Sequence, residues 1–335
     1  MKKLVYIVIL SLLLLPGCAV LRKPAPTETP YETVDPYEGL VQVESGFGTK
    51  MWVVEQEGVP VSTLTAADFH DGEYTGDRYA VRRGIDVSEH QGEIDWAAVA
   101  ESGVEFAVLR AGYRGYGEAG VLRRDEFFQY NVNGAAENGI EMGVYFFSQA
   151  TSVEEAEEEA DFLLDILSVY TVEAFALPVY FDWEAISQDT ARTDGLDGET
   201  ITDCAAAFCK KIADAGYAAG IYLYRNLGYF SYDLSRLTDY TLWVGAVGDW
   251  PDFYYAHTLW QYSYTGAVPG IAAATDLNLW FREPSEELAD SADVTAGSET
   301  DEAADSGADE IVESEADGSA DSEAPELIER DTDEK

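Results

Sequence analysis

Short apolar runs alternate with longer amphipathic stretches from about residue 80 onward. Apolar runs rich in Val, Ile, Tyr and Phe are typical of buried strands, and amphipathic stretches of about ten or more residues are typical of helices. The pattern predicts strands at 81–88, 106–112, 142–149, 177–184, 218–224, 241–247, 257–264 and 276–281. It predicts helices at 94–103, 125–139, 152–170, 199–216 and 230–237.

The order of these elements predicts an α/β fold. Several of the helices stop at a glycine (Gly103, Gly139 and Gly216), the residue that most readily adopts the left-handed conformation at a helix end. Five strand–helix units followed by strands with little helix predict a modified TIM-like (β/α)5(β)3 barrel, whose last third has lost its helices. An open doubly wound sheet is the alternative. The glycine-rich stretch RAGYRGYGEAG lacks the lysine and spacing of a phosphate loop, so we interpret it as a tyrosine-bearing loop.

The first eighteen residues, MKKLVYIVILSLLLLPGC, have the layout of a secretory signal. Two lysines precede an apolar run, 4–15, that is too short for a comfortable membrane-spanning helix. Because it ends in Gly-Cys, the segment resembles a bacterial lipoprotein signal, in which Cys18 is lipidated and becomes the first mature residue. An ordinary signal cleaved elsewhere and an uncleaved anchor are the alternatives. All three predict export, either lipid-anchored to the outer face of the bacterial cell membrane or secreted.

Composition divides the rest of the chain. Residues 19–40 are rich in proline and polar residues and are expected to form a tether. Residues 41–79 are expected to form a small extension, with a β-hairpin as one interpretation. Residues 80–282 carry the barrel pattern. The net charge is −44, and residues 283–335 hold 21 acids against two bases and no aromatic residue. We expect this tail to be disordered, with a solvating role, or alternatively to capture metal ions or dock a protein.

The charge balance also bears on partners. Binding to phosphates requires a basic surface, so nucleic acid is not an expected partner. The oligomeric state is left open by the sequence.

Four acids fall at ends of predicted strands. Asp86 lies late in the first strand, Asp182 and Glu184 end the fourth, and Asp276 begins the eighth. Active sites of such barrels gather at the carboxyl ends of the strands. Residues two apart in a strand face the same side, so Asp182 and Glu184 should point inward while Trp183 faces the helices. Four neighbouring acids repel one another, so at least one should have a raised pKa, as a general acid requires.

Two chemistries use such a cluster: a divalent cation site and glycoside hydrolysis. Aromatic residues on or near the predicted strand ends favour the second, because rings can stack on sugar faces and a bare cation site does not need them. We therefore predict a glycosidase without a metal ion or other cofactor, although any single ring can instead belong to the core. The candidate substrate-binding residues are Tyr113, Tyr145, Phe147, Tyr222, Tyr224, Trp243, Trp260 and Tyr262.

Several sequence segments resemble those of a known protein family. GIDVSEHQGEIDW, residues 84–96, resembles the opening signature of the glycoside hydrolase family 25 lysozymes, the N-acetylmuramidases. Later blocks match in the same order: GVYFFSQA (143–150), LPVYFDWE (177–184), GYAAGIYLYRN (216–226) and LWQYSYTGAVPGIAAATDLNLW (259–280). The resemblance implies a (β/α)5(β)3 barrel over 80–282. It also implies cleavage of the β-1,4 bond between N-acetylmuramic acid and N-acetylglucosamine in the glycan strands of peptidoglycan.

The resemblance also implies a role for each acid. Glu184 would be the general acid. Asp182 would lie under the anomeric carbon, either holding the N-acetyl group of the substrate for internal attack or stabilising the sugar cation directly. Asp86 and Asp276 would orient this pair and bind sugar. The spacing does not distinguish retention from inversion of configuration, because the separation of the carboxyl groups depends on side-chain rotamers.

The chain departs from the family at two places. Many relatives have His-Trp where this chain has Glu89-His90, and often histidine where it has Phe146. Glu89 either adds a fifth acid near the site or faces solvent. Two alternative functions follow: a non-catalytic surface glycan-binding lipoprotein, suggested by Glu89 and by a negative charge that an anionic wall repels, and a glycosidase acting on another N-acetylated polymer such as chitin.

Overall fold

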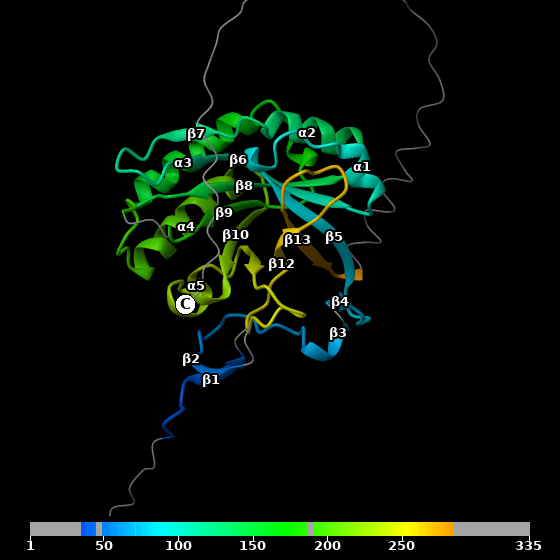
Figure 1. Ribbon diagram of the computed structural model, residues 1–335. Coiled ribbons are helices and arrows are strands. Elements are labelled where there is room, and N and C mark those ends of the chain that lie inside the picture. The colour runs from blue at the N-terminus through cyan, green and yellow to red at the C-terminus, as the bar shows by residue number, and fades with distance from the viewer. Residues whose placement is uncertain (1–34, 45–48, 71, 187–189, 285–335) are drawn as a thin grey trace, which may run out of the picture. The chain divides into compact units, whose positions relative to one another are not determined.

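The computed structural model describes residues 35–44, 49–70, 72–186 and 190–284 (Figure 1). The expected signal peptide with Cys18, most of the expected tether and the expected disordered tail from residue 285 lie outside the described residues. Within the part that the structure describes, no helix has the length and apolar character needed to cross a membrane.

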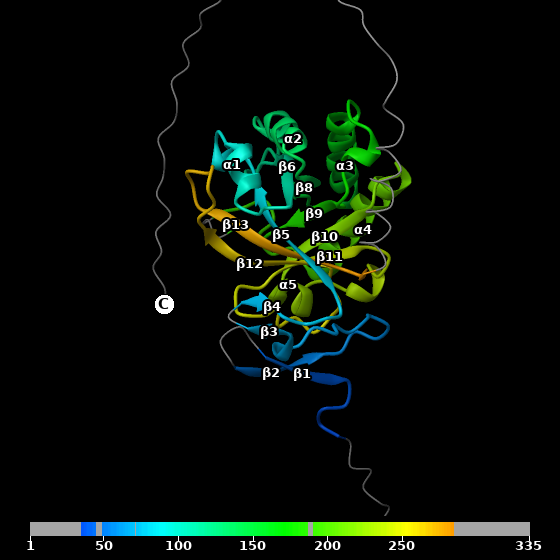
Figure 2. The same ribbon diagram turned by 90° about the vertical axis from the view of Figure 1, so that its right-hand side faces the viewer.

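Within the described ranges, eight strands close into a barrel (Figures 1 and 2). They are β5 (Ala80–Val87), β6 (Phe106–Arg114), β8 (Glu141–Ser148), β9 (Val179–Trp183), β10 (Ala219–Tyr224), β11 (Thr241–Gly245), β12 (Leu259–Gly266) and β13 (Thr275–Arg282). Hydrogen bonding follows the order β5-β13-β12-β11-β10-β9-β8-β6, and the parallel pairing of β5 with β6 closes the ring. The predicted barrel is therefore confirmed, and the alternative of an open doubly wound sheet is wrong.

The helices lie on the outer side of the first strands. They are α1 (Trp96–Glu101), α2 (Phe128–Glu137), α3 (Val153–Leu167), α4 (Gly198–Asp214) and α5 (Arg225–Phe230). A short strand, β7 (Leu122–Arg124), pairs antiparallel with the end of β6. The helix predicted at 230–237 is wrong, because the structure places α5 before it and only a 3-10 turn at Leu234–Arg236. The backbone N–H of Leu234 is taken by the side chain of Gln56 at 2.5 Å, which satisfies it without a longer helix.

Apolar side chains form two packed layers. The larger one lies between the strands and the elements outside them, and it includes Trp183 and Phe146. The smaller one fills the barrel interior with Phe106, Val108, Leu177, Tyr180, Tyr222, Trp243 and Leu259. Interior aromatic rings pack edge to face, with the centroids of Tyr222 and Trp243 4.7 Å apart. This interior packing forms a dry floor beneath the carboxyl ends of the strands.

The N-terminal extension covers the side of the barrel opposite α1, α2 and α3 (Figures 1 and 2). It contains an antiparallel pair, β1 (Leu40–Glu44) with β2 (Lys50–Val54), and a smaller pair, β3 (Phe69–His70) with β4 (Glu73–Tyr74). Both views place these strands on the side of the barrel opposite α1, α2 and α3 (Figures 1 and 2).

Aromatic side chains seal this contact. The ring of Phe69 meets those of Trp260 and Phe281 edge to face, with centroids 5.4 and 6.2 Å apart. Tyr74 and Tyr79 pack against the ring of Phe281 as well. The extension thus gives the outer faces of β12 and β13 the apolar cover that helices give the earlier strands.

Removal of the Phe69 ring is expected to destabilise the barrel. Phe69→Ala should lower the free energy of unfolding by about 1–3 kcal/mol, less than the roughly 3–5 kcal/mol of a fully buried phenylalanine, because Phe69 is only half-buried. Urea denaturation followed by tryptophan fluorescence measures this change. Phe230→Ala is the matched control, since that ring is 60% exposed and its loss should cost less than about 0.5 kcal/mol. Equal effects of the two substitutions would contradict the sealing role.

Candidate active site

The barrel brings the four predicted acids to one end. Asp86 is the second-last residue of β5, Asp182 lies on β9, and Glu184 follows the last residue of β9. Asp276 is the second residue of β13, which runs antiparallel to β12. Because β13 is reversed, its beginning lies beside the carboxyl ends of the parallel strands. The four carboxyl groups form two hydrogen-bonded pairs, Asp86 with Asp276 and Asp182 with Glu184.

The first pair rests on two side-chain amides. Asn278 Nδ2 donates a hydrogen bond to Asp86 Oδ2 at 2.7 Å, and Gln261 Nε2 donates to the same oxygen at 2.8 Å. These amides connect Asp86 to the barrel floor, since Trp243 Nε1 donates to Asn278 Oδ1 and the Tyr222 hydroxyl to Gln261 Oε1. Burial raises the pKa of Asp86 to about 6, although these amides and Asp276 favour its ionised form.

The second pair is more strongly perturbed. Asp182 is 4% exposed. Burial raises the pKa of its carboxyl well above the usual range, and the charges of Glu184 and Asp86 raise it further, whereas Arg110 opposes them. Two interacting carboxyls of this kind share a proton and titrate as a unit. Within the described residues, Asp182 Oδ1 is buried, and no N–H or hydroxyl group donates a hydrogen bond to it.

Arg110 brings a positive charge to this acidic cluster. Its Nε donates to Asp125 Oδ2 at 2.8 Å, and its NH2 group lies 3.0 Å from Glu89 Oε1. The guanidinium also lies over the ring of Tyr113, 4.9 Å from the centroid. Glu89 is therefore near the site, where it is paired with a cation rather than left facing solvent.

The predicted aromatic residues separate into three groups. Tyr113, Tyr145, Phe147 and Tyr224 are partly exposed near the acids, where a sugar could reach them. Tyr222 and Trp243 are 5% and 2% exposed, so they support the floor and offer no open ring face. Trp260 and Tyr262 point outward, because they occupy the alternate positions of β12 to Leu259 and Gln261. The structure does not bring these last two rings to the site.

Several residues at the site were missed by sequence reasoning. Arg110, Gln261 and Asn278 contact the acids or their partners, and the Tyr264 hydroxyl hydrogen-bonds that of Tyr222. Strand alternation offered a signal for Gln261 and Asn278, since each lies two residues from a residue predicted or found to face inward. Within the described residues, no three His, Cys, Asp or Glu side chains are grouped as ligands for a metal ion.

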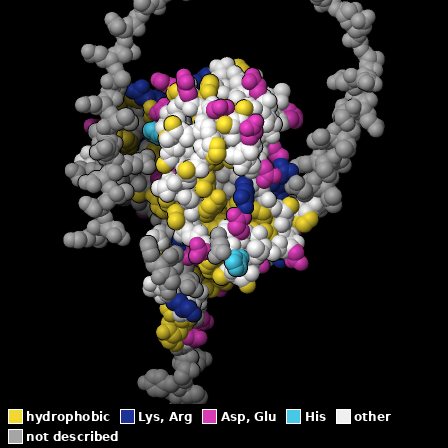
Figure 3. All heavy atoms as spheres, turned by 45° about the vertical axis from the view of Figure 1, so that its right-hand side comes forward, with side chains coloured by type: hydrophobic (Ala, Val, Ile, Leu, Met, Phe, Trp, Pro, Cys, Tyr) yellow, Lys and Arg dark blue, Asp and Glu magenta, His cyan; other side chains and the backbone are white. Residues whose placement is uncertain are grey.

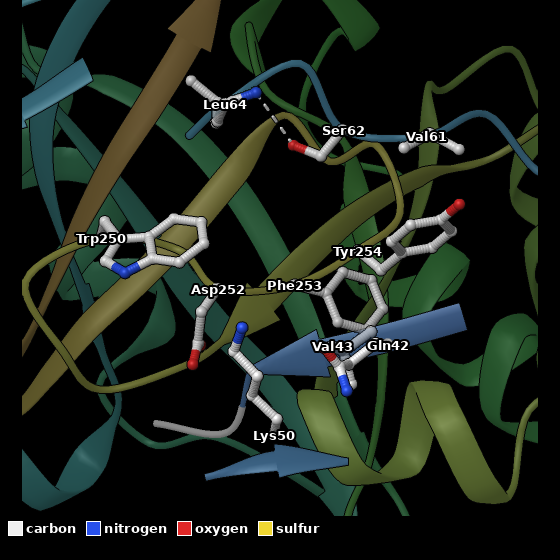
Figure 4. Close-up of a pocket in the computed structure, with 10 residues that line it drawn as sticks. All are labelled: Gln42, Val43, Lys50, Val61, Ser62, Leu64, Trp250, Asp252, Phe253 and Tyr254. Atoms are coloured by element: carbon white, nitrogen blue, oxygen red, sulfur yellow. Dashed lines mark hydrogen bonds between the residues drawn. The ribbon is translucent and has the colours of Figure 1, made fainter. Parts of the chain in front are cut away.

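A cavity of about 360 Å³ lies elsewhere, between the β1–β2 pair and the loop after β11 (Figure 4). Lys50 and Val43 line it from the strands, and Trp250 and Asp252 line it from the loop. Asp252 is bound by Arg225 at 2.6 Å. None of the four acids lines this cavity, so it is separate from the candidate active site.

Comparison with known proteins identifies a family and several relatives of this chain. The family model described as glycosyl hydrolases family 25 matches residues 85–271. An autolytic lysozyme of Clostridium acetobutylicum is 25% identical over 198 residues, which cover 58% of this chain and 55% of that protein. Lysozyme M1 of Streptomyces globisporus is 26% identical over 217 residues, covering 58% and 66%. The chain thus spans about half to two thirds of the length of these relatives.

A solved structure shows the same fold. The modular autolysin LytC from Streptococcus pneumoniae, determined in complex with a synthetic peptidoglycan ligand, superposes with a TM-score of 0.53 at 23% identity. The match covers 72% of this chain and 57% of that one. The family match spans 187 of 335 residues, from 85 to 271, and includes Asp86, Asp182 and Glu184. The chain therefore belongs to glycosyl hydrolase family 25.

Proposed function

We propose that this protein is a peptidoglycan hydrolase that cleaves the β-1,4 bond between N-acetylmuramic acid and N-acetylglucosamine. The observation that carries the proposal is the hydrogen-bonded pair of buried Asp182 and partly exposed Glu184, at the end of a barrel of this family. The names of the related lysozymes and the peptidoglycan ligand of the related autolysin support this choice of substrate.

Glu184 is proposed as the general acid. Its side chain is partly exposed, unlike that of Asp182, so it can reach the oxygen of a glycosidic bond. Protonation of that oxygen makes it a better leaving group as the bond to the anomeric carbon breaks. The two carboxyls share a proton, and Glu184 acts as the acid when the proton is on Glu184 and Asp182 is ionised.

Asp182 is proposed to act at the anomeric centre. Its buried Oδ1 receives no hydrogen bond from the described residues and is therefore suited to accept one from an acetamido N–H of the substrate. That contact would orient the acetamido oxygen for internal attack. The same carboxylate could instead stabilise the positive charge directly. Asp86, held by two amides, keeps a second negative charge beside the reacting centre.

Loss of the general acid is expected to abolish turnover while leaving the fold intact. In Glu184→Gln, release of reducing ends from purified peptidoglycan should fall by about 10³-fold or more, because the amide cannot donate the required proton. Pull-down with insoluble peptidoglycan should still show binding. Glu137→Gln, an exposed position on α2, is the control and should retain activity. Undiminished release by Glu184→Gln would remove this residue from the mechanism.

The same experiment separates the alternative function. Acidic side chains are spread over the face shown in Figure 3, and the chain carries a net charge of −44, which opposes approach to an anionic wall at low salt. Glycan binding by the unmutated protein without any release of reducing ends would favour a non-catalytic glycan-binding protein. Equal release from chitin and from peptidoglycan would favour a broader N-acetylated polymer as substrate.

The buried carboxyl should also affect stability as a function of pH. The folded pKa of Asp182 is raised, so between the unfolded value near 3.8 and the folded value the native state holds more protons, and stability falls as pH rises. Asp182→Asn removes this loss, so its Tm should exceed that of the unmutated protein by about 3 °C or more at pH 7 and match it near pH 4.

Differential scanning calorimetry at several pH values measures the difference in Tm. Asp239→Asn, at an exposed position, is the matched control and should show a small difference that does not grow with pH. A lower Tm for Asp182→Asn at neutral pH would show that the buried charge is not a source of instability.

We further propose that the protein is exported and anchored to the membrane through Cys18, on the strength of the N-terminal sequence alone. A single lipidated cysteine would hold the enzyme at the outer face of the membrane, next to the glycan strands. In a bacterial host, Cys18→Ser should move the protein from the detergent phase to the aqueous phase in a Triton X-114 partition. Unchanged partitioning would argue against lipidation at this cysteine.

A further inference from the structure

Glu184 lies just outside the sheet. The pairing of β9 with β8 ends at Trp183, opposite Ser148, so Glu184 is the first residue beyond the strand. A group that transfers a proton must nevertheless keep its position, since a displacement of about 1 Å can cost roughly 100-fold in rate. The contacts made by the backbone carbonyl of Glu184 therefore bear on the position of its side chain.

The peptide unit that joins Glu184 to Ala185 is held at both of its polar atoms. Gln149 Nε2 donates a hydrogen bond to the carbonyl oxygen of Glu184 at 3.0 Å. On the other side, the backbone N–H of Ala185 donates to the hydroxyl of Tyr224. With both atoms bound, the peptide plane cannot rotate without breaking a hydrogen bond.

The side-chain amide of Gln149 is held by hydrogen bonds at both its nitrogen and its oxygen. Its side chain is fully buried at the end of β8, where Nε2 also donates to the carbonyl of Ser148 at 2.8 Å. Oε1 accepts a hydrogen bond from the hydroxyl of Thr193 at 2.9 Å. The amide therefore has its nitrogen directed toward Glu184 and its oxygen toward Thr193, in the loop that follows Glu184.

Two ion pairs hold the backbone of Gln149. Its N–H donates to Glu159 Oε1 at 3.3 Å, and its carbonyl accepts from Arg192 NH1 at 3.3 Å. Glu159, fully buried on α3, is bound by Arg114 Nε at 2.7 Å. Arg192 is bound by Glu155 Oε1 at 2.5 Å. Helix α3 and the loop that carries Arg192 thus converge on Gln149, the residue that follows β8.

We propose that Gln149 is a positioning residue for Glu184, with Thr193 fixing the orientation of its amide, an inference that rests on the proposed function of Glu184. The amide fastens the peptide that carries the acid to the neighbouring strand. Loss of the amide leaves the carboxyl of Glu184 in place on the chain but frees its backbone, so proton donation suffers while the sugar-contacting rings stay where they are.

The test compares kcat with KM in the full-length protein. Gln149→Met keeps the side-chain length and removes both hydrogen-bonding functions. We expect kcat on soluble peptidoglycan glycan strands to fall about 10–100-fold, with KM changed less than about twofold. A residue that only supports folding would lower Tm and the active fraction without a pH-dependent change.

The pH profile supplies a readout that a merely structural role would not move. A looser Asp182–Glu184 pair shares its proton less strongly, so the basic limb of kcat should move to lower pH. Charged and titratable groups that face this pair are left unchanged by the substitution. They are Asp86 on β5, Arg110 on β6, Tyr145 on β8, Tyr222 and Tyr224 on β10, Tyr264 on β12 and Asp276 on β13.

A pair of variants at Thr193 keeps the proposal testable if Gln149→Met fails to fold. Thr193→Val preserves shape and removes the hydroxyl, so kcat should fall about 3–10-fold, in line with about 1 kcal/mol for one hydrogen bond. Thr193→Ser keeps the hydroxyl and should restore most of kcat. Thr202→Val, at a buried threonine of α4 whose hydroxyl donates to the Gly198 carbonyl, is the matched control and should lower Tm but leave kcat and the pH profile unchanged.

The outcomes separate this inference from the proposed function. Undiminished activity of Glu184→Gln would overturn both. If Glu184→Gln is inactive while folded Gln149→Met and Thr193→Val keep the kcat and pH profile of the unmutated protein, only the positioning role of Gln149 is wrong. Equal kcat for Thr193→Val and Thr193→Ser would likewise overturn the role of the hydroxyl.

Discussion

Desolvation of carboxyl groups by the packed barrel interior is the constraint on which this site depends. The aromatic floor excludes water beneath Asp86 and Asp182, and the resulting cost of ionisation raises both pKa values. Two amides then restore part of the lost solvation to Asp86. The same burial that makes the acids costly for the fold gives them protonation states useful for acid catalysis near neutral pH.

Much of the fold was predictable because the spacing of apolar residues that distinguishes strands from helices is a local property of the sequence. The eight strands lie within a few residues of their predicted limits, and closure followed from the number of strand–helix units. The convergence of the four acids followed from the same pattern, since each lies at a strand end. Their hydrogen bonds did not follow, because donors such as Asn278 and Gln261 come from strands far along the chain.

The direction in which the aromatic side chains point, into or out of the barrel, was predicted less well than their position along the strands. Trp260 and Tyr262 are aromatic and close to a strand end, but they occupy the outward positions of β12, where Phe69 covers Trp260. The sequence around Trp260 does not predict that its ring is covered, since Phe69 lies about 190 residues earlier in the chain. Trp243 faces inward as expected, yet it lies too deep to offer a face to a sugar. Proximity in sequence to a strand end predicts location better than it predicts exposure.

The N-terminal extension, residues 41–79, bears on which part of the chain forms one folding unit. The family match begins at residue 85, whereas side-chain contacts tie Gln56 and Phe69 to segments that follow β10 and to β12. The family match is therefore shorter than the portion of the chain that folds together. Recombination at the boundary of the family match would separate the catalytic strands from the segment that covers their outer face. We therefore expect the N-terminal extension and the barrel to be inherited together.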